Sequence, residues 1–184
     1  MDTLLKFFLF LLIFFNINTL ILADTIIEER KFNIYAKLPL LPKIAIMEID
    51  TSLNIKNNKY RYDFNIKSKN IVKFINQVDG MGKVSGIFNN SYQPTEYEYS
   101  YKRKNKEKFV KLNYLDNEVV NIITIPKFDK NELSEVTGEM LLDTIDPSTF
   151  FLTLLNFNLT DNCNKLFKIF DGKRRYNIVF KNKF

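Results

Sequence analysis

Residues 59–68 place the tightest constraint on the fold, because apolar and polar side chains alternate there without interruption. Successive side chains of a β-strand point to opposite faces of a sheet, so a period of two predicts a half-buried strand. Turn-forming residues, mostly asparagine and aspartate, separate this segment from others like it. The further segments predicted to be strands are 32–38, 44–55, the residues after Pro94, 108–115 and 119–125.

A short helix is predicted at residues 147–156. Asp146 is a good N-cap acceptor, and Pro147 suits the first helical position, where its missing N–H would have no partner in any case. Apolar side chains then follow at helical spacing, which predicts a helix with one apolar face. These side chains belong to Phe150, Phe151, Leu154 and Leu155.

Two further strands are predicted at residues 165–170 and 175–180. Asp171 and Gly172 stand between them, and this dipeptide tolerates the positive φ angles of tight hairpin turns. The end of the chain therefore reads as a helix followed by a β-hairpin.

Four segments depart from the alternation. The apolar residues of 70–78 are spaced by three and four, which indicates a short helix or an irregular strand crossing. The glycines of residues 80–86 indicate turns and bulges, since no P-loop Lys-Ser/Thr pair follows them. Residues 127–145 are polar and irregular and predict a long loop. Pro39 and Pro42 exclude a central strand, because proline cannot donate to a ladder.

Together these segments predict a mainly β protein. We expect a strongly curved antiparallel sheet of about seven to ten strands, half-barrel or barrel-like, with one short helix near the C-terminal end. The helix at 147–156 is expected to lie against the concave face of the sheet, where Phe150, Phe151 and Leu154 share one core with the strands.

The first 23 residues read as a secretory signal peptide. Lys6 supplies a positive start, and residues 7–15 form an apolar run that is short for a membrane span. Residues 24–184 are then expected to form a single exported, soluble domain, and an uncleaved anchor is the alternative. The formal net charge of +6 favours anionic neighbours such as lipid headgroups, although it also fits plain solubility. Nucleic acid is not an expected partner, because no motif of a known reader occurs.

The sequence offers little to a catalyst. It contains no histidine, which removes the commonest general base and most zinc sites, and no Ca²⁺-binding loop pattern occurs. We therefore expect no metal and no cofactor. Two carboxylates brought together by the fold could still cleave a glycoside. Cys163 has no second cysteine in the chain, so it is expected to be buried or to pair with another molecule.

Three tyrosines, Tyr97, Tyr99 and Tyr101, share one face of a predicted strand. They predict either a packed aromatic ladder or a stacking surface for a ligand, and the helix residues Phe150, Phe151 and Leu154 would complete such a surface. A basic run follows, which is either a solvated hairpin tip or a contact with an anionic membrane. Its cationic residues are Lys102, Arg103, Lys104 and Lys106.

Arg174 and Arg175 follow the hairpin turn and must point to opposite faces of their strand. We expect one of them to form an ion pair with a carboxylate, of which Asp171 is the nearest in sequence, and the other to be solvated. An anion-binding site is the alternative, because a guanidinium group matches phosphate and carboxylate geometry.

Two motifs at the C-terminal end, D-P-S-T-F-F-L-T-L-L from Asp146 and F-D-G-K-R-R-Y from Phe170, resemble the exported bacterial proteins grouped as domain of unknown function 3108. G-K-V-S-G-I-F from Gly82 and the step from Pro94 to Tyr97 resemble the family's middle strands. The resemblance covers most of residues 32–184. It implies a location in the Gram-negative envelope and a mostly antiparallel sheet, and it implies no established activity.

By a looser analogy, the expected architecture resembles periplasmic lipoprotein carriers, whose sheet holds acyl chains against a helix; fold analogy alone is a weak argument for function. The sequence therefore favours a non-catalytic periplasmic protein that binds an apolar or amphipathic ligand, or an envelope partner, between sheet and helix. The alternatives are a carboxylate-dependent glycan hydrolase and a purely structural envelope protein.

Overall fold

The computed structural model describes residues 25–36, 43–70, 73, 77–103, 106–127, 136, 138–155 and 164–181. The predictions for the signal peptide, the prolines at 39 and 42, Lys104 and Cys163 lie outside these residues.

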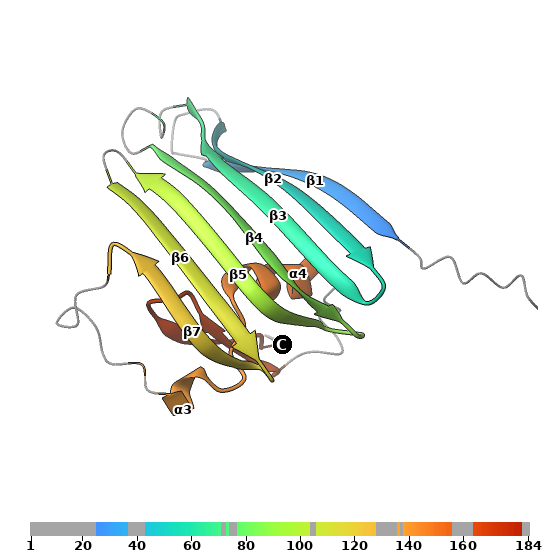
Figure 1. The fold of residues 1–184 in the computed structure, drawn as a ribbon. Coiled ribbons are helices and arrows are strands. Elements are labelled where there is room, and N and C mark those ends of the chain that lie inside the picture. Colours follow the sequence, from blue (N-terminus) through green and yellow to red (C-terminus); the bar gives the residue numbers. More distant parts are fainter. Residues whose placement is uncertain are drawn as a thin grey trace, which may run out of the picture.

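A seven-stranded sheet makes up most of the described chain, and the strands lie side by side in chain order (Figure 1). Each strand pairs antiparallel with the next, which confirms the predicted mainly β, antiparallel class. The strands are β1 (Ile26–Ala36), β2 (Ile44–Lys56), β3 (Lys59–Ser68), β4 (Val78–Phe88), β5 (Tyr92–Arg103), β6 (Lys106–Leu115) and β7 (Glu118–Ile125).

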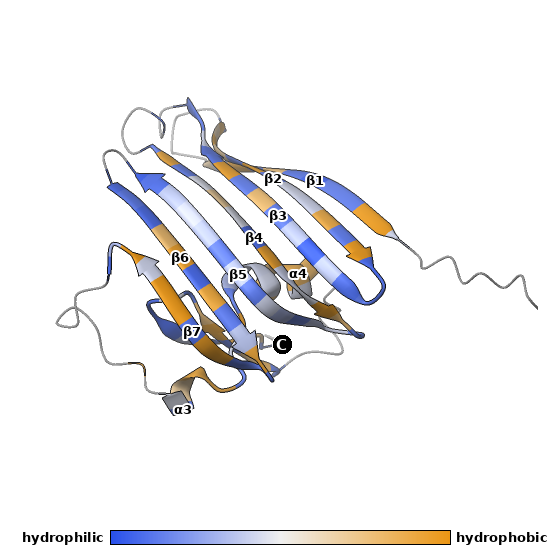
Figure 2. Cartoon of the chain, viewed as in Figure 1, coloured by the Kyte–Doolittle hydropathy of each residue, from blue (hydrophilic) through white to orange (hydrophobic). Residues whose placement is uncertain are grey.

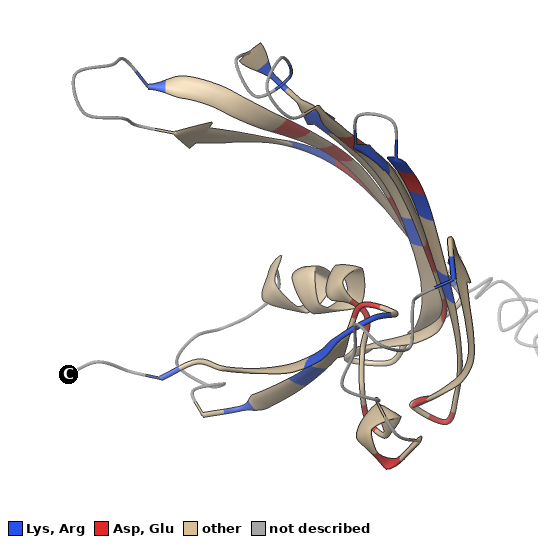
Figure 3. Ribbon diagram, turned by 90° about the vertical axis from the view of Figure 1, so that its left-hand side faces the viewer, with Lys and Arg blue, Asp and Glu red and all other residues tan. Residues whose placement is uncertain are grey.

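The strong curvature expected of a half-barrel or barrel-like sheet is not found. β1 pairs only with β2 and β7 only with β6 in the described residues, so the sheet stays open with two edges. An antiparallel meander forms from short turns alone and needs no closing pair, which is why strand periodicity did not distinguish an open sheet from a closed one. Seen along its edge, the sheet bends gently toward one side, where the remaining elements lie (Figure 3).

In the described part of the chain these elements include two helices and a hairpin. The four-residue helix α3 (Gly138–Leu141) interrupts the segment that was expected to be a loop. Helix α4 (Pro147–Leu155) matches the predicted helix, and the strands β8 (Leu166–Phe170) and β9 (Arg175–Val179) form the predicted hairpin around Gly172, whose φ is 88°. We call the side of the sheet that α4 covers its inner face.

The start of α4 shows why the chain folds inward here. The Asp146 carboxylate accepts hydrogen bonds from the backbone N–H groups of Ser148 and Thr149, both at 2.9 Å, and from the Thr149 hydroxyl at 2.6 Å. This is the predicted N-cap. The Tyr60 hydroxyl of β3 lies 3.2 Å from the Thr149 hydroxyl, so the cap also ties the helix to the sheet.

Hydropathy alternates along the strands, as Figure 2 shows by its banding, and the apolar positions face α4. The inner face, α3, α4 and β8 share one core. Within α4, Leu152 is the most deeply buried apolar residue, with 1% of its surface exposed. The other buried members are Leu53, Ile55, Tyr60, Tyr62, Val84, Tyr92, Tyr97, Val110, Leu112, Tyr114, Val119, Leu141 and Phe170.

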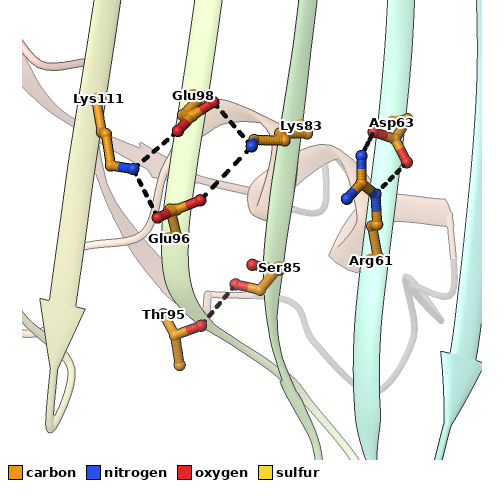
Figure 4. Close-up of polar contacts among 8 residues, drawn as sticks. All are labelled: Arg61, Asp63, Lys83, Ser85, Thr95, Glu96, Glu98 and Lys111. Atoms are coloured by element: carbon orange, nitrogen blue, oxygen red, sulfur yellow. Dashed lines mark hydrogen bonds and ion pairs between the residues drawn. The ribbon is translucent and has the colours of Figure 1, made fainter.

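The outer face is lined with paired charges (Figure 4). The Lys111 ammonium lies 2.7 Å from Glu96 and 2.8 Å from Glu98, and the Lys83 ammonium lies 2.9 Å from Glu98. These opposite charges sit on neighbouring strands, where cross-strand pairs meet directly. The outer face is therefore a solvated surface whose charges are mostly satisfied locally.

Candidate functional site

A cavity of about 500 Å³ lies between the inner face, α4 and the β8–β9 hairpin. Its walls are mainly aromatic and aliphatic, and charged side chains of β6 and the hairpin add polar groups to them. Its lining residues are Ile49, Tyr62, Phe64, Tyr97, Tyr99, Tyr101, Lys108, Val110, Pro147, Ser148, Phe151, Asp171, Lys173, Arg174 and Tyr176.

Four rings form a stacked row along one wall of this cavity. Their order is Tyr62, Phe64, Tyr99, Tyr101, and neighbouring ring centroids are 6.0, 5.8 and 5.6 Å apart with interplanar angles of 29°, 26° and 26°. Such offset stacking is favourable for aromatic pairs. The row gives the cavity one flat aromatic wall built from β3 and β5.

The row crosses β4 because β4 presents no side chain at that point. Phe64 and Tyr99 stand on either side of Gly82 in the pairing register, two strand spacings or about 9–10 Å apart at the backbone. Their rings nevertheless stack at 5.8 Å, because both lean over Gly82. A Cβ at Gly82 would collide with the Phe64 ring and lie 2.6 Å from the carbonyl oxygen of Glu98.

This finding corrects the sequence prediction for the glycines. Gly80, Gly82 and Gly86 lie within strand β4 and share the inner face, and only Gly86 is next to a register shift. A Cβ at Gly80 would lie 2.8 Å from the Tyr99 hydroxyl, and one at Gly86 would lie 2.7 Å from the Tyr60 ring. Glycines on the inner face of a strand make room for neighbouring rings, whereas the prediction considered only turns and bulges.

The charged groups of the cavity are mostly basic. Lys108 of β6 and Lys173 and Arg174 of the hairpin face a single carboxylate, Asp171, among the described lining residues. The Lys108 ammonium lies 5.8 Å from the centre of the Tyr101 ring, within cation–π distance. An apolar cavity with a basic margin can hold a molecule that has an apolar body and a negative end.

Asp171 does not form the expected ion pair with either arginine. Its Oδ1 accepts hydrogen bonds from the backbone N–H groups of Lys173, at 2.8 Å, and Arg174, at 2.6 Å, so it stabilises the turn. No described carboxylate pairs with Arg174 or Arg175. An aspartate at the start of a turn binds backbone donors two residues on, and this local geometry wins over the guanidinium groups.

Six of the nine residues proposed from the sequence line the cavity. They are Tyr97, Tyr99, Tyr101, Phe151, Asp171 and Arg174.

The other three residues lie elsewhere. Phe150 packs on the hairpin, with ring centroids 5.2 Å from Phe167 and 6.4 Å from Phe180. Leu154 and Arg175 do not line the cavity, and the Nε of Arg175 is buried without a hydrogen-bond partner among the described residues.

Sequence reasoning missed Tyr62, Phe64 and Lys108 as cavity residues. The signal was present, because Tyr62 and Phe64 share the face of the strand with the clearest alternation. The register of β3, β4 and β5 could not be predicted from the sequence. Phe64 meets Tyr99 only because β3 and β5 pair on either side of β4. The sequence places Lys108 at the start of a predicted strand, and only the β5–β6 register shows that it is the inner-face neighbour of Tyr101.

A second hollow, of about 860 Å³, lies at the end of the sheet where β3 meets β4 and β5 meets β6. Lysines are common in its lining, which includes Lys67, Lys69, Lys73, Lys102 and Lys108. Tyr101 and Lys108 line both hollows, so the inner cavity adjoins this basic end. The predicted membrane-contact residues Lys102, Arg103 and Lys106 lie at the same end and are exposed.

Burial sets the acid–base behaviour at the base of α4. Asp146 is fully buried, and burial raises the pKa of its carboxyl from 3.8 to about 6 against the lowering effect of its hydrogen bonds with Thr149 and Ser148. Burial also raises the pKa of the Tyr97 hydroxyl, and the nearby Asp146 charge adds to that effect. These groups hold the helix against the sheet, and Asp146 is not among the residues that line the cavity.

Within the described residues, no group of three or more acidic or thiol side chains is arranged to hold a metal ion. Nor does that part of the chain contain a helix long and apolar enough to cross a membrane.

The fold and the cavity define a class of protein: an open antiparallel sheet whose inner face, with one helix and one hairpin, lines an aromatic cavity that is open to solvent. A family model described as "Protein of unknown function (DUF3108)" matches residues 31–183. The chain therefore belongs to this family, as the C-terminal motifs indicated. No curated protein and no solved structure matches the chain.

Proposed function

We propose that the protein is an exported, non-catalytic protein of the bacterial envelope that binds an apolar or amphipathic molecule in the cavity between sheet, α4 and hairpin. The observation that carries the proposal is the cavity itself, about 500 Å³ in volume and walled by the stacked row from Tyr62 to Tyr101. Cavities of this size and character bury most of a small ligand.

The partial burial of the ring row supports ligand binding over simple packing of a core. Rings that served only to fill a core would be covered on both sides, yet Phe64, Tyr99 and Tyr101 are only partly buried and turn toward open space in the cavity. Aromatic surface that remains partly open after such packing marks a place where another molecule can bind.

The basic end of the sheet supports a contact with anionic lipid as part of the same function. Lys102, Arg103 and Lys106 are exposed at the end of the β5–β6 hairpin, next to the hollow that shares Tyr101 and Lys108 with the cavity. Each lysine or arginine near an anionic membrane contributes about 1 kcal/mol of attraction. A ligand taken from or given to a membrane would meet the protein at this end.

The glycan hydrolase is the weaker alternative. A two-carboxylate mechanism needs a pair separated by roughly 5–10 Å in an open cleft. Asp171 is the one carboxylate among the described lining residues, and its Oδ1 already accepts two backbone hydrogen bonds.

Native mass spectrometry of the protein purified from its own envelope tests the proposal. We expect bound lipid that exchanges with vesicles. In parallel, binding of the neutral apolar dye N-phenyl-1-naphthylamine would be titrated by fluorescence, and Tyr99→Ser is expected to weaken it several-fold by removing the middle of the ring row.

Tyr35→Ser is the matched control, because Tyr35 is 47% exposed on β1 and does not line the cavity. Thermal melting identifies variants that fail to fold, and Phe151→Ala provides a second cavity variant on α4. Protein that emerges empty and binds no dye would refute the proposal and leave a structural role.

A further inference from the structure

The residues that line the cavity also indicate the chemical class of its ligand. We infer that the cavity takes an anionic amphiphile, a molecule with one acyl-type chain and a negative head, and that Lys108 binds the head. This inference rests on the proposed function, because it concerns the same cavity.

Lys108 is out of place on an apolar face. In the β5–β6 register it stands directly opposite Tyr101, on the face that carries Tyr97, Tyr99, Val110 and Leu112. Its ammonium is within ion-pair distance of no described carboxylate, whereas the other two half-buried lysines of the seven-stranded sheet, Lys83 and Lys111, each pair with glutamates. Lys108 is half-buried and has no carboxylate partner among the described residues, so an anionic ligand would be bound more strongly there than a neutral one. Hydrogen bonds between an ammonium and an anionic group are charge-assisted and therefore stronger than neutral ones.

The position of Lys108 also orients the ligand. Lys108 and Tyr101 line both the cavity and the hollow at the basic end, so a head held there sits at the junction of the two. The ring row runs inward from Tyr101 through Tyr99 and Phe64 to Tyr62, and this wall is aromatic along its length. An acyl chain attached to the head would lie along the ring row. The negative head of the ligand would then meet Lys108, and its apolar chain would meet the aromatic rings.

The hairpin side of the cavity also favours a ligand with a negative head. Lys173 and Arg174 reach the same cavity from the hairpin, while the Asp171 carboxylate is occupied by backbone N–H groups. The lining is therefore net basic in the described residues. A cationic amphiphile would be repelled, and an uncharged one would leave Lys108 without a partner.

The test compares two probes with the same acyl chain, lysophosphatidylglycerol and monoacylglycerol, each below its micelle concentration. Both would displace N-phenyl-1-naphthylamine from the full chain. We expect the anionic probe to bind about tenfold more tightly than the neutral one, the scale of one charge-assisted hydrogen bond, and to lose affinity as salt increases.

In Lys108→Gln the two probes should bind within about twofold of each other, because the cation that distinguishes the anionic head from the neutral one has been removed. Lys108→Arg should keep the preference. Lys59→Gln removes the same charge from an exposed residue at the far end of β3, outside the cavity, and should behave as the wild type.

The possible outcomes distinguish failure of the inference about Lys108 from failure of the proposed function. Equal affinity of the wild type for both probes overturns the inference about the head and leaves the proposed function standing. An anionic preference that survives in Lys108→Gln overturns the assignment to Lys108. Failure of the wild type to bind the dye or either probe refutes the proposed function as well.

Discussion

The two faces of the same sheet are stabilised in different ways. On the outer face, lysines and glutamates of β4, β5 and β6 pair across strands at 2.7–2.9 Å and remain partly in water. On the inner face, rings from β3 and β5 meet over the glycines of β4 and pack toward α4. Alternate residues of each strand serve the two purposes, so one register fixes both arrangements.

The difference shows where stability and function reside. Exposed ion pairs contribute little, because water screens them and ordering long side chains costs entropy. Burial of large apolar side chains contributes more per residue. The inner face therefore supplies most of the stability, and it also leaves part of its aromatic surface open to the cavity. Two of the predictions below test the helix that covers the inner face, and the third tests the outer face.

The largest effect is expected for Leu152→Ala in α4. Leu152 is 1% exposed, so its truncation leaves a cavity in the core and should lower the free energy of unfolding by about 2–5 kcal/mol. Leu115→Ala is the control, since Leu115 is 63% exposed and should change stability by less than about 0.5 kcal/mol. Urea denaturation measures both, and equal losses at the two positions would contradict the placement of α4.

A pH-dependent effect is expected for Asp146→Asn. The folded pKa of about 6 exceeds the ordinary value of 3.8, so between these two pH values the unfolded chain releases a proton that the folded protein retains. The stabilising contribution of Asp146 is thus present below about pH 4 and is lost as pH rises through 6. Asparagine can still accept the Ser148 and Thr149 N–H bonds but does not titrate.

The stability of the variant relative to the wild type should therefore rise by about 3 kcal/mol from pH 4 to pH 7. Denaturation curves at both pH values measure this change. A difference between variant and wild type that does not vary with pH would show that Asp146 ionises as easily in the folded protein as in the unfolded chain.

Six of the seven sheet strands and the C-terminal helix and hairpin were predictable because their signals are local, whereas β4 was missed because its glycines were interpreted as turns and bulges. The alternation in residues 59–68, the cap at Asp146 and the Asp171–Gly172 turn each depend on a few neighbouring residues. Helix α3 was missed because a single turn is too short to show helical periodicity.

The cavity was only partly predictable because it depends on register between strands. Tyr97, Tyr99 and Tyr101 were found from their own alternation. The role of Gly82 needed the knowledge that Phe64 and Tyr99 flank it, and sequence alone gives no such pairing. Whether the sheet closed could not be read either, since edge strands and paired strands share the same period of two.

The smallest effect is expected on the outer face, for Glu98→Gln. Glu98 pairs with Lys111 and Lys83, which lower the pKa of its carboxyl in that order, yet its side chain remains 23% exposed. Solvent screening keeps such pairs weak, so the loss at pH 7 should be below about 1 kcal/mol. A lowered folded pKa gives stability that is present above the unfolded value and disappears as pH falls through the folded one. The loss in Glu98→Gln should accordingly vanish in acid.

Glu107→Gln, at a pair whose glutamate is 73% exposed, is the control and should change even less. A loss of several kcal/mol at Glu98 would show instead that the charged outer face stabilises the sheet as strongly as the aromatic inner face does.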